Sequence, residues 1–214
     1  KLAAGFRKTL TGWRRATKFY GYSEAGAFGA MLEGWLDQVA RELLPKDPPA
    51  ALALFEAFID ADAAWFDRAD DSNGEIGDAV RAACRHWLQA AAHCDAPPDS
   101  WPERLLKLCQ ADQYGARDEL LRRAEMLLDE PSLRGLVARL ESQLSKALDT
   151  SPHRESPTID VLRISGALSL LSESLRDPDI LVRASLRYSP NPNPNQRQAF
   201  ARAYLDANRP ADAL

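Results

Sequence analysis

The amino-acid sequence predicts an all-α protein, in which antiparallel helical hairpins stack as a tetratricopeptide-like α-solenoid of about ten helices. Three observations predict this class. Apolar residues recur at every third or fourth position through most of the chain, which is the period of an amphipathic helix. Proline, glycine, asparagine and aspartate punctuate these stretches, and no stretch alternates between polar and apolar residues as a strand does. The predicted helix pairs begin roughly 36 to 51 residues apart, which is the range of helical-hairpin repeats.

The composition is that of a globular protein. Of the 214 residues, 45% are hydrophobic and 27% are charged, which excludes a disordered or collagen-like chain. The three cysteines are an odd number, which is typical of free thiols in a reducing compartment, and we expect a cytoplasmic protein. No apolar run reaches the roughly 20 residues that span a bilayer, so we expect no membrane partner.

Start and stop signals divide the first half of the chain into a basic first helix and three further stretches. Pro45 ends one apolar stripe, and Asp47 followed by Pro48 is a typical helix start. A second stripe continues to Asn73 and Gly74, which close it. These signals predict helices over residues 23–45, 47–74 and 75–94.

The second half is divided in the same way, and residues 150–157 form its clearest loop. We therefore predict a helical repeat region over residues 1–149 and tetratricopeptide-like repeats over residues 158–214, both in one superhelix. Helical patterns are under way at Lys1 and begin again before Leu214, so we expect a fragment of a longer protein, truncated at the C-terminus. Helices are predicted over residues 100–109, 120–128, 129–148, 159–175, 177–186 and 200–205.

Charge is distributed unevenly, although the net charge is only −4. Residues 1–23 contain six basic residues and no acidic residue, so the remainder carries −10. Phe6, Leu10, Trp13 and Tyr20 share one helical face here, and the basic side chains occupy the other. Three roles are open for this helix: packing on the repeats, binding nucleic acid or an acidic partner, and lying on a membrane surface. The candidate partner-binding residues are Arg7, Lys8, Arg14, Arg15 and Lys18.

Residues 70–78 form an acidic run around Asn73 and Gly74. Aligned with a calcium-binding loop, the run lacks both the first ligand and the bidentate ligand. A tight turn between helices is favoured instead, in which Asn73 and Gly74 adopt left-handed conformations. The acids that we add to the candidate partner-binding set are Asp70, Asp71 and Asp78.

Asp62 falls at the centre of the helical face that Phe55, Phe58 and Trp65 share. A carboxylate buried there needs a partner, and an arginine, a tryptophan N–H or a helix N-terminus on a neighbouring helix can supply one. We predict a buried structural acid; a functional acid with a shifted pKa is the alternative. The acids on the opposite face are expected to be solvated: Glu56, Asp60 and Asp67.

The chain contains no arrangement that indicates catalysis or metal binding. Cys84 and Cys94 are expected to point into the core, while His86 and His93 point outward and lie about 10 Å apart along a helix, too far apart for one zinc ion. The sequence has no nucleophile elbow, phosphate-binding glycine loop or zinc-protease motif. We predict no catalytic residue, no cofactor and no metal.

Three blocks together resemble a known family. They are residues 22–25 leading into the stripe over residues 32–44, the run 70–78, and the closing residues 205–214. In this order and spacing they resemble a bacterial family of uncharacterised helical-repeat proteins, a domain of unknown function that often follows a SWIM-type zinc finger. The resemblance extends from about residue 7 to the end. It implies a tetratricopeptide-like helical fold without known catalytic residues; the zinc-finger cysteines themselves are absent.

These features predict a non-catalytic interaction or scaffold domain that binds a macromolecular partner, most simply a protein. The alternative is a nucleic-acid-associated module that uses the basic first helix, whose binding would weaken steeply with salt. A third alternative is an enzyme that depends on carboxylates or a metal, which would require several acids to converge in one cleft.

Overall fold

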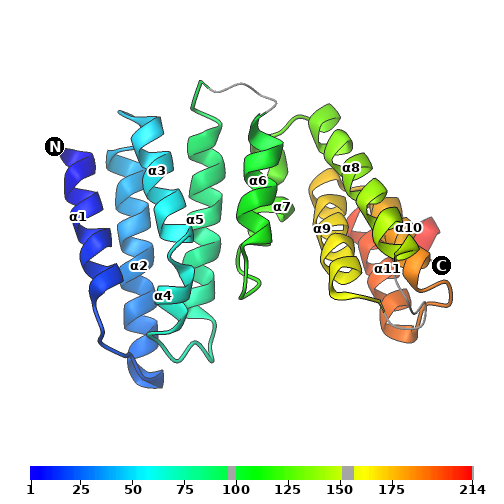
Figure 1. Cartoon of the computed structure of the whole chain (residues 1–214), viewed down its shortest axis with the longest axis horizontal. Coiled ribbons are helices and arrows are strands. Elements are labelled where there is room, and N and C mark those ends of the chain that lie inside the picture. Colours follow the sequence, from blue (N-terminus) through cyan, green and yellow to red (C-terminus); the bar gives the residue numbers. More distant parts are fainter. Residues whose placement is uncertain (96–99, 151–156, 214) are drawn as a thin grey trace. The chain divides into compact units, whose positions relative to one another are not determined.

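The structure, a computed structural model, describes residues 1–95, 100–150 and 157–213 (Figure 1). These residues form eleven α-helices and no β-strand, so the predicted all-α class is confirmed. Two compact units divide the chain: unit 1 is Lys1–Leu127 and unit 2 is Leu128–Leu214. The division falls before the loop at residues 150–157, where the sequence suggested a boundary, and residues 151–156 lie outside the described part.

Unit 1 contains seven of the described helices, and its core lies where α2, α3 and α5 run side by side (Figure 1). Large apolar side chains fill the core, and among them Phe28, Phe55, Phe58 and Trp87 from these helices and Trp65 from α4 are almost completely buried. The helices are α1 (Leu2–Arg15), α2 (Tyr22–Glu42), α3 (Pro48–Ile59), α4 (Asp62–Phe66), α5 (Glu75–Ala91), α6 (Trp101–Gln110) and α7 (Glu119–Arg122).

Two predicted helices of unit 1 are interrupted. The stretch expected over residues 47–74 ends at Ile59 and resumes only as the short α4. At the break, side chains donate to carbonyls that a continuing helix would pair with backbone N–H groups: Trp65 Nε1 to Phe58 and Arg117 Nη2 to Ile59, each at 3.0 Å. The stretch over residues 120–128 likewise divides into α7 and a 3₁₀ turn over Ala124–Met126.

Close packing of α2 on α5 depends on glycine. A Cβ atom built on Gly29 would lie 2.9 Å from the Cβ of Glu75 and 3.2 Å from its carbonyl oxygen. Glycine at this position therefore lets the two backbones approach more closely than any other residue would allow. Gly34, on the same helix, has nothing within 4 Å of such an atom.

Unit 2 contains four described helices; the first three begin at or next to the predicted residue, whereas the last begins at Pro194 and not at residue 200. The side chains of Asp129, Thr158 and Asn193 each accept a backbone N–H at the start of a helix. The carboxylate of Asp179 accepts from Tyr204 Oη and from Arg209 Nη1, each at 2.8 Å, which lowers the pKa of that carboxyl. The helices are α8 (Glu130–Asp149), α9 (Ile159–Leu175), α10 (Pro178–Tyr188) and α11 (Pro194–Asp206).

None of the helices over the described residues combines the length and apolar character needed to cross a membrane.

Candidate functional site

The candidate site is α1, whose two faces differ in chemistry as the sequence predicted. Phe6 and Leu10 are buried against unit 1. The ring of Phe6 meets Trp35 of α2 edge-on at 6.0 Å between centroids, and Trp13 does the same at 5.9 Å. These aromatic contacts attach α1 to α2 and turn its polar face to solvent.

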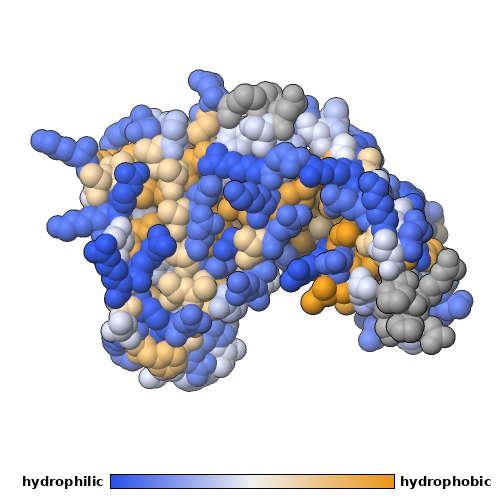
Figure 2. All heavy atoms as spheres, viewed as in Figure 1, coloured by the Kyte–Doolittle hydropathy of each residue, from blue (hydrophilic) through white to orange (hydrophobic). Residues whose placement is uncertain are grey.

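Four basic side chains occupy the solvent face of α1. They are exposed, and within the described part of the chain none of them forms an ion pair. Hydrophilic side chains projecting from the α1 end of unit 1 are visible in Figure 2. Asp60 interacts electrostatically with Arg14, but no acid of the described residues forms an ion pair with any of the four, so most of their charge is available to a partner. The four basic residues are Arg7, Lys8, Arg14 and Arg15.

Lys18 and Tyr20, expected to continue this helix, do not belong to it. The helix ends at Arg15, and Tyr20 instead forms an isolated parallel bridge with Ala69 and stacks on Phe28 at 4.2 Å. Lys18 Nζ donates to Glu24 at 2.9 Å, which raises the pKa of the lysine. The prediction of one amphipathic helix through Tyr20 is therefore wrong, because backbone pairing with residue 69 keeps this segment extended.

Arg68 attaches the end of α1 to the body of unit 1, a role that the sequence did not reveal. Its guanidinium donates from Nη1 to the carbonyl of Trp13 at 2.7 Å and from Nε to the carbonyl of Lys18 at 3.1 Å. The same group lies over the rings of Tyr20 and Phe28. A single buried arginine thus fixes where α1 ends and where the following segment lies.

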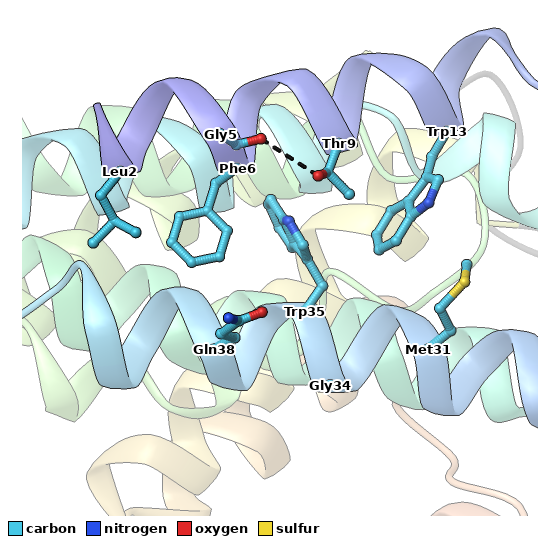
Figure 3. Close-up of a pocket in the computed structure, with 9 residues that line it drawn as sticks. All are labelled: Leu2, Gly5, Phe6, Thr9, Trp13, Met31, Gly34, Trp35 and Gln38. Carbon is cyan, nitrogen blue, oxygen red and sulfur yellow. Dashed lines mark hydrogen bonds between the residues drawn. The ribbon is translucent and has the colours of Figure 1, made fainter.

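A groove of about 490 Å³ separates α1 from α2 (Figure 3). The residues that line it are mainly apolar. Gly5 on α1 and Gly34 on α2 also line it and contribute no side chain. No charged side chain is among its nine lining residues. The apolar members are Leu2, Phe6, Trp13, Met31 and Trp35.

The acidic turn uses its carboxylates locally. Asp71 accepts the backbone N–H groups of Ile76 and Gly77 at 2.7 and 3.1 Å, and therefore caps α5. Asp70 accepts from the backbone and hydroxyl of Ser72, and Asp78 pairs with Arg81 at 2.8 Å.

Of the two residues expected to be left-handed in this turn, only Gly74 is, with φ of 83°. Asn73 does not adopt a positive φ, so that part of the prediction is wrong. Its side chain instead accepts from Tyr22 Oη at 3.3 Å and donates to Glu75 at 3.3 Å. These bonds tie the turn to the start of α2.

Asp62 is 4% exposed and lies within a network of buried hydrogen bonds. Arg117 donates to it from Nε at 2.7 Å, and donates as well to the carbonyls of Leu108 and Ile59 at 3.2 and 3.0 Å. Arg117 satisfies one oxygen of the carboxylate, and the backbone N–H of Ala63 donates to the other at 2.7 Å. Arg117 thereby connects the break between α3 and α4 to the end of α6. By holding this arginine, Asp62 helps to connect three helices, which is a structural role.

Of the three acids expected to be solvated, Glu56 is partly buried, whereas Asp60 and Asp67 are exposed as predicted. Glu56 accepts from the indole of Trp87 at 3.0 Å and pairs with Arg104, which also covers the Trp87 and Trp101 rings. Burial raises the pKa of Asp60, an effect opposed by the nearby guanidinium of Arg117. Arg104 of α6 reaches Glu56, a contact between residues distant in sequence that helical periodicity alone does not reveal.

The cysteines and histidines of α5 also differ in part from expectation. Cys84 is fully buried, and burial raises its pKa well above the ordinary value. Cys94 is only half-buried, and its thiol donates to the Ala90 carbonyl. His86 does not point to solvent but stacks on Phe55 at 5.3 Å. Over the described residues, no group of three or more potential ligands could hold a metal ion.

Comparison with known proteins places this arrangement in a family. A model of a family of unknown function, DUF6880, matches residues 1–176. The chain belongs to that family. The match includes all of α1, the α1–α2 groove and the rest of unit 1. No curated protein and no solved structure matches the chain.

Proposed function

We propose that this chain is a non-catalytic interaction domain that binds a protein partner through α1. The observation that carries the proposal is the set of four basic side chains on α1, all exposed and all without an ion pair among the described residues. Elsewhere in unit 1 arginines neutralise nearby acids, as Arg85 does Glu119 at 2.9 Å. A surface of uncompensated charge steers a partner of opposite sign during association.

The proposed architecture is a tetratricopeptide-like α-solenoid of antiparallel hairpins, in a bacterial helical-repeat family that can follow a SWIM-type zinc finger. Successive helices of unit 2 pack as neighbours, α8 with α9 and α9 with α10, which supports this proposal within that unit. Free thiols at all three cysteines support a cytoplasmic location. The acidic turn is left out of the proposed surface because its carboxylates have local partners.

The second candidate is a nucleic-acid-associated module. It is favoured by the absence of any acidic residue from α1, since phosphate groups bind to clustered cations. The two candidates share a surface and differ in partner class, so one experiment can separate them.

The experiment places a photoreactive residue on the proposed surface of the whole chain. Thr11→p-benzoylphenylalanine lies between the four cations, and Gly135→p-benzoylphenylalanine on α8 is the matched control, because it is exposed and has open space around it. Both variants are irradiated in cells that carry the native gene. We expect a discrete protein adduct from position 11 that is absent from position 135.

Digestion with protease or nuclease identifies the class of the cross-linked partner, and charge reversal tests whether its binding depends on the basic residues of α1. The protein proposal predicts an adduct that protease removes and nuclease does not, and that disappears in the variant Arg14→Glu, Arg15→Glu. A nuclease-sensitive adduct would support the second candidate instead. Equal labelling from both positions would contradict an interaction surface on α1.

A further inference from the structure

We propose that the α1–α2 groove binds an amphipathic helix with acidic flanks, and this rests on the proposed function because it names the partner's binding element. The groove is mainly apolar from Leu2 to Trp13 on α1, and Thr9 and Gln38 are its polar lining residues. That span is about 16 Å, the length of roughly three turns of a bound helix. Helical segments bind such grooves through apolar side chains at helical spacing.

Two glycines make the groove accessible to another backbone. Gly5 on α1 and Gly34 on α2 both line it, and a Cβ atom added at either position would have nothing within 4 Å. Neither glycine therefore places a side chain over the groove, whose middle holds the indole of Trp35 between Phe6 and Trp13 (Figure 3). A ridge of side chains on a partner helix fits between two helices in this way.

The floor supplies one unpaired polar group. Trp35 is 6% exposed, and its Nε1 is buried without a hydrogen-bond partner in the described part of the chain. A buried donor left unpaired is unfavourable. A small rotation of Trp35 toward an acceptor on the bound helix would satisfy it, while Phe6 and Trp13 continue to pack on either side (Figure 3).

The border of the groove sets the charge of the partner. On α1, Lys8 follows Gly5 by three residues, and Arg15 lies two turns further along the same side of the helix. On α2, Arg41 follows Gln38 by three residues, and it is exposed and without an ion pair among the described residues. These three cations border an apolar floor, so acidic residues on the flanks of a bound helix complement them.

Two acids of α2 near the groove have polar partners within unit 1. Asp37 lies 3.4 Å from His86 Nε2, and Glu42 accepts from Gln38 Nε2 at 2.9 Å. They do not neutralise the border cations. A basic helix would face repulsion from Lys8, Arg15 and Arg41 at this border.

The test selects binders from a displayed library of random peptides of about 16 residues, a length of roughly 24 Å when helical. The full chain is the target. The Gly34→Leu variant, which fills the groove with a side chain, is used to remove peptides that bind elsewhere. Leucine at an exposed helix position favours folding, and circular dichroism of the variant checks this. Gly135→Leu on α8 is the matched control.

We expect enriched peptides with apolar residues at helical spacing and net negative charge. Their affinity, measured by fluorescence anisotropy, should fall about tenfold or more in Gly34→Leu and in Lys8→Glu, Arg15→Glu. It should stay unchanged in Gly135→Leu and in Arg163→Glu, Arg197→Glu, which reverses two exposed unpaired arginines of unit 2. No enrichment, basic peptides, or equal binding to Gly34→Leu would overturn the proposal.

The same variants also test two other possible ligands of the groove, a second copy of the chain and nucleic acid. Sedimentation that shows a dimer of the wild type and a monomer of Gly34→Leu would assign the groove to a second copy and overturn the proposal. Labelled DNA or RNA that binds wild type and Gly34→Leu equally, with no peptide enriched, would overturn it in favour of nucleic acid. If peptides fail but the position 11 adduct forms, only this inference falls and the proposed function stands.

Discussion

Unit 1 depends on two buried arginines whose partners are distant in sequence. Arg117 is 3% exposed and connects Asp62 with the carbonyls of Ile59 and Leu108. Arg68 is 9% exposed and binds the carbonyls of Trp13 and Lys18. Both side chains supply several donors in fixed positions, which a lysine cannot reproduce.

Removing one member of the buried pair should be costly. We expect Arg117→Met to lower the free energy of unfolding by about 3–5 kcal/mol, because it leaves the Asp62 carboxylate buried without its cation. Adding Asp62→Leu should recover part of the loss, since no uncompensated charge then remains. Urea unfolding followed by circular dichroism measures both. A double variant less stable than Arg117→Met would show that the pair is not coupled in this way.

At the scale of the elements, the structure explains which predictions from sequence succeed. The bounds of α9, Ile159–Leu175, agree with the prediction because Thr158 caps the start and Asp177 with Pro178 opens the next helix. Local signals of this kind define an element without tertiary information. The break after Ile59 could not be predicted, because it involves Arg117, far along the chain.

The candidate site could be predicted only in part: its basic residues follow from the sequence, but the groove does not. Four of the five basic residues lie on α1 as periodicity suggests, and Lys18 does not, because the bridge at Tyr20 depends on residues from the far end of α4. The groove was missed because it requires α1 and α2 to lie side by side. Its signal in the sequence was limited to Gly5 and Gly34, two glycines in otherwise regular helices.

The close approach of α2 to α5 gives a prediction with an internal control. Gly29→Ala should destabilise the protein by about 1–3 kcal/mol, because the added methyl would overlap Glu75. Gly34→Ala on the same helix should instead stabilise it by about 0.5–1 kcal/mol, through helix propensity alone. Thermal unfolding of the two variants provides the comparison. Equal effects would mean that helix packing does not require Gly29.

The attachment of α1 gives a prediction about local stability. Arg68→Leu removes the donors to the Trp13 and Lys18 carbonyls, so the end of α1 should open more often than the core. We expect amide hydrogen exchange in α1 to accelerate about tenfold or more while exchange in α5 stays slow. Uniform acceleration in both helices would instead indicate global destabilisation.

At the scale of the whole molecule, the distribution of charge is uneven. Unit 1 places together on α1 four cations that are unpaired among the described residues, while the remainder of the chain is acidic overall. In unit 2 several arginines pair with acids, for example Arg183 with Glu141 and Arg134 with Asp177. The small net charge of the chain therefore conceals one basic surface, and family membership over residues 1–176 includes that surface.

The most direct test of this account measures the affinity of the partner captured at position 11 for two forms of the full chain. One is the wild type, and the other carries Arg7→Glu, Lys8→Glu, Arg14→Glu and Arg15→Glu. At about 50 mM salt we predict binding at least about tenfold weaker for the variant, with the difference largely lost at about 300 mM, because salt screens exposed charges. Equal affinity of the two forms at low salt would contradict recognition through α1.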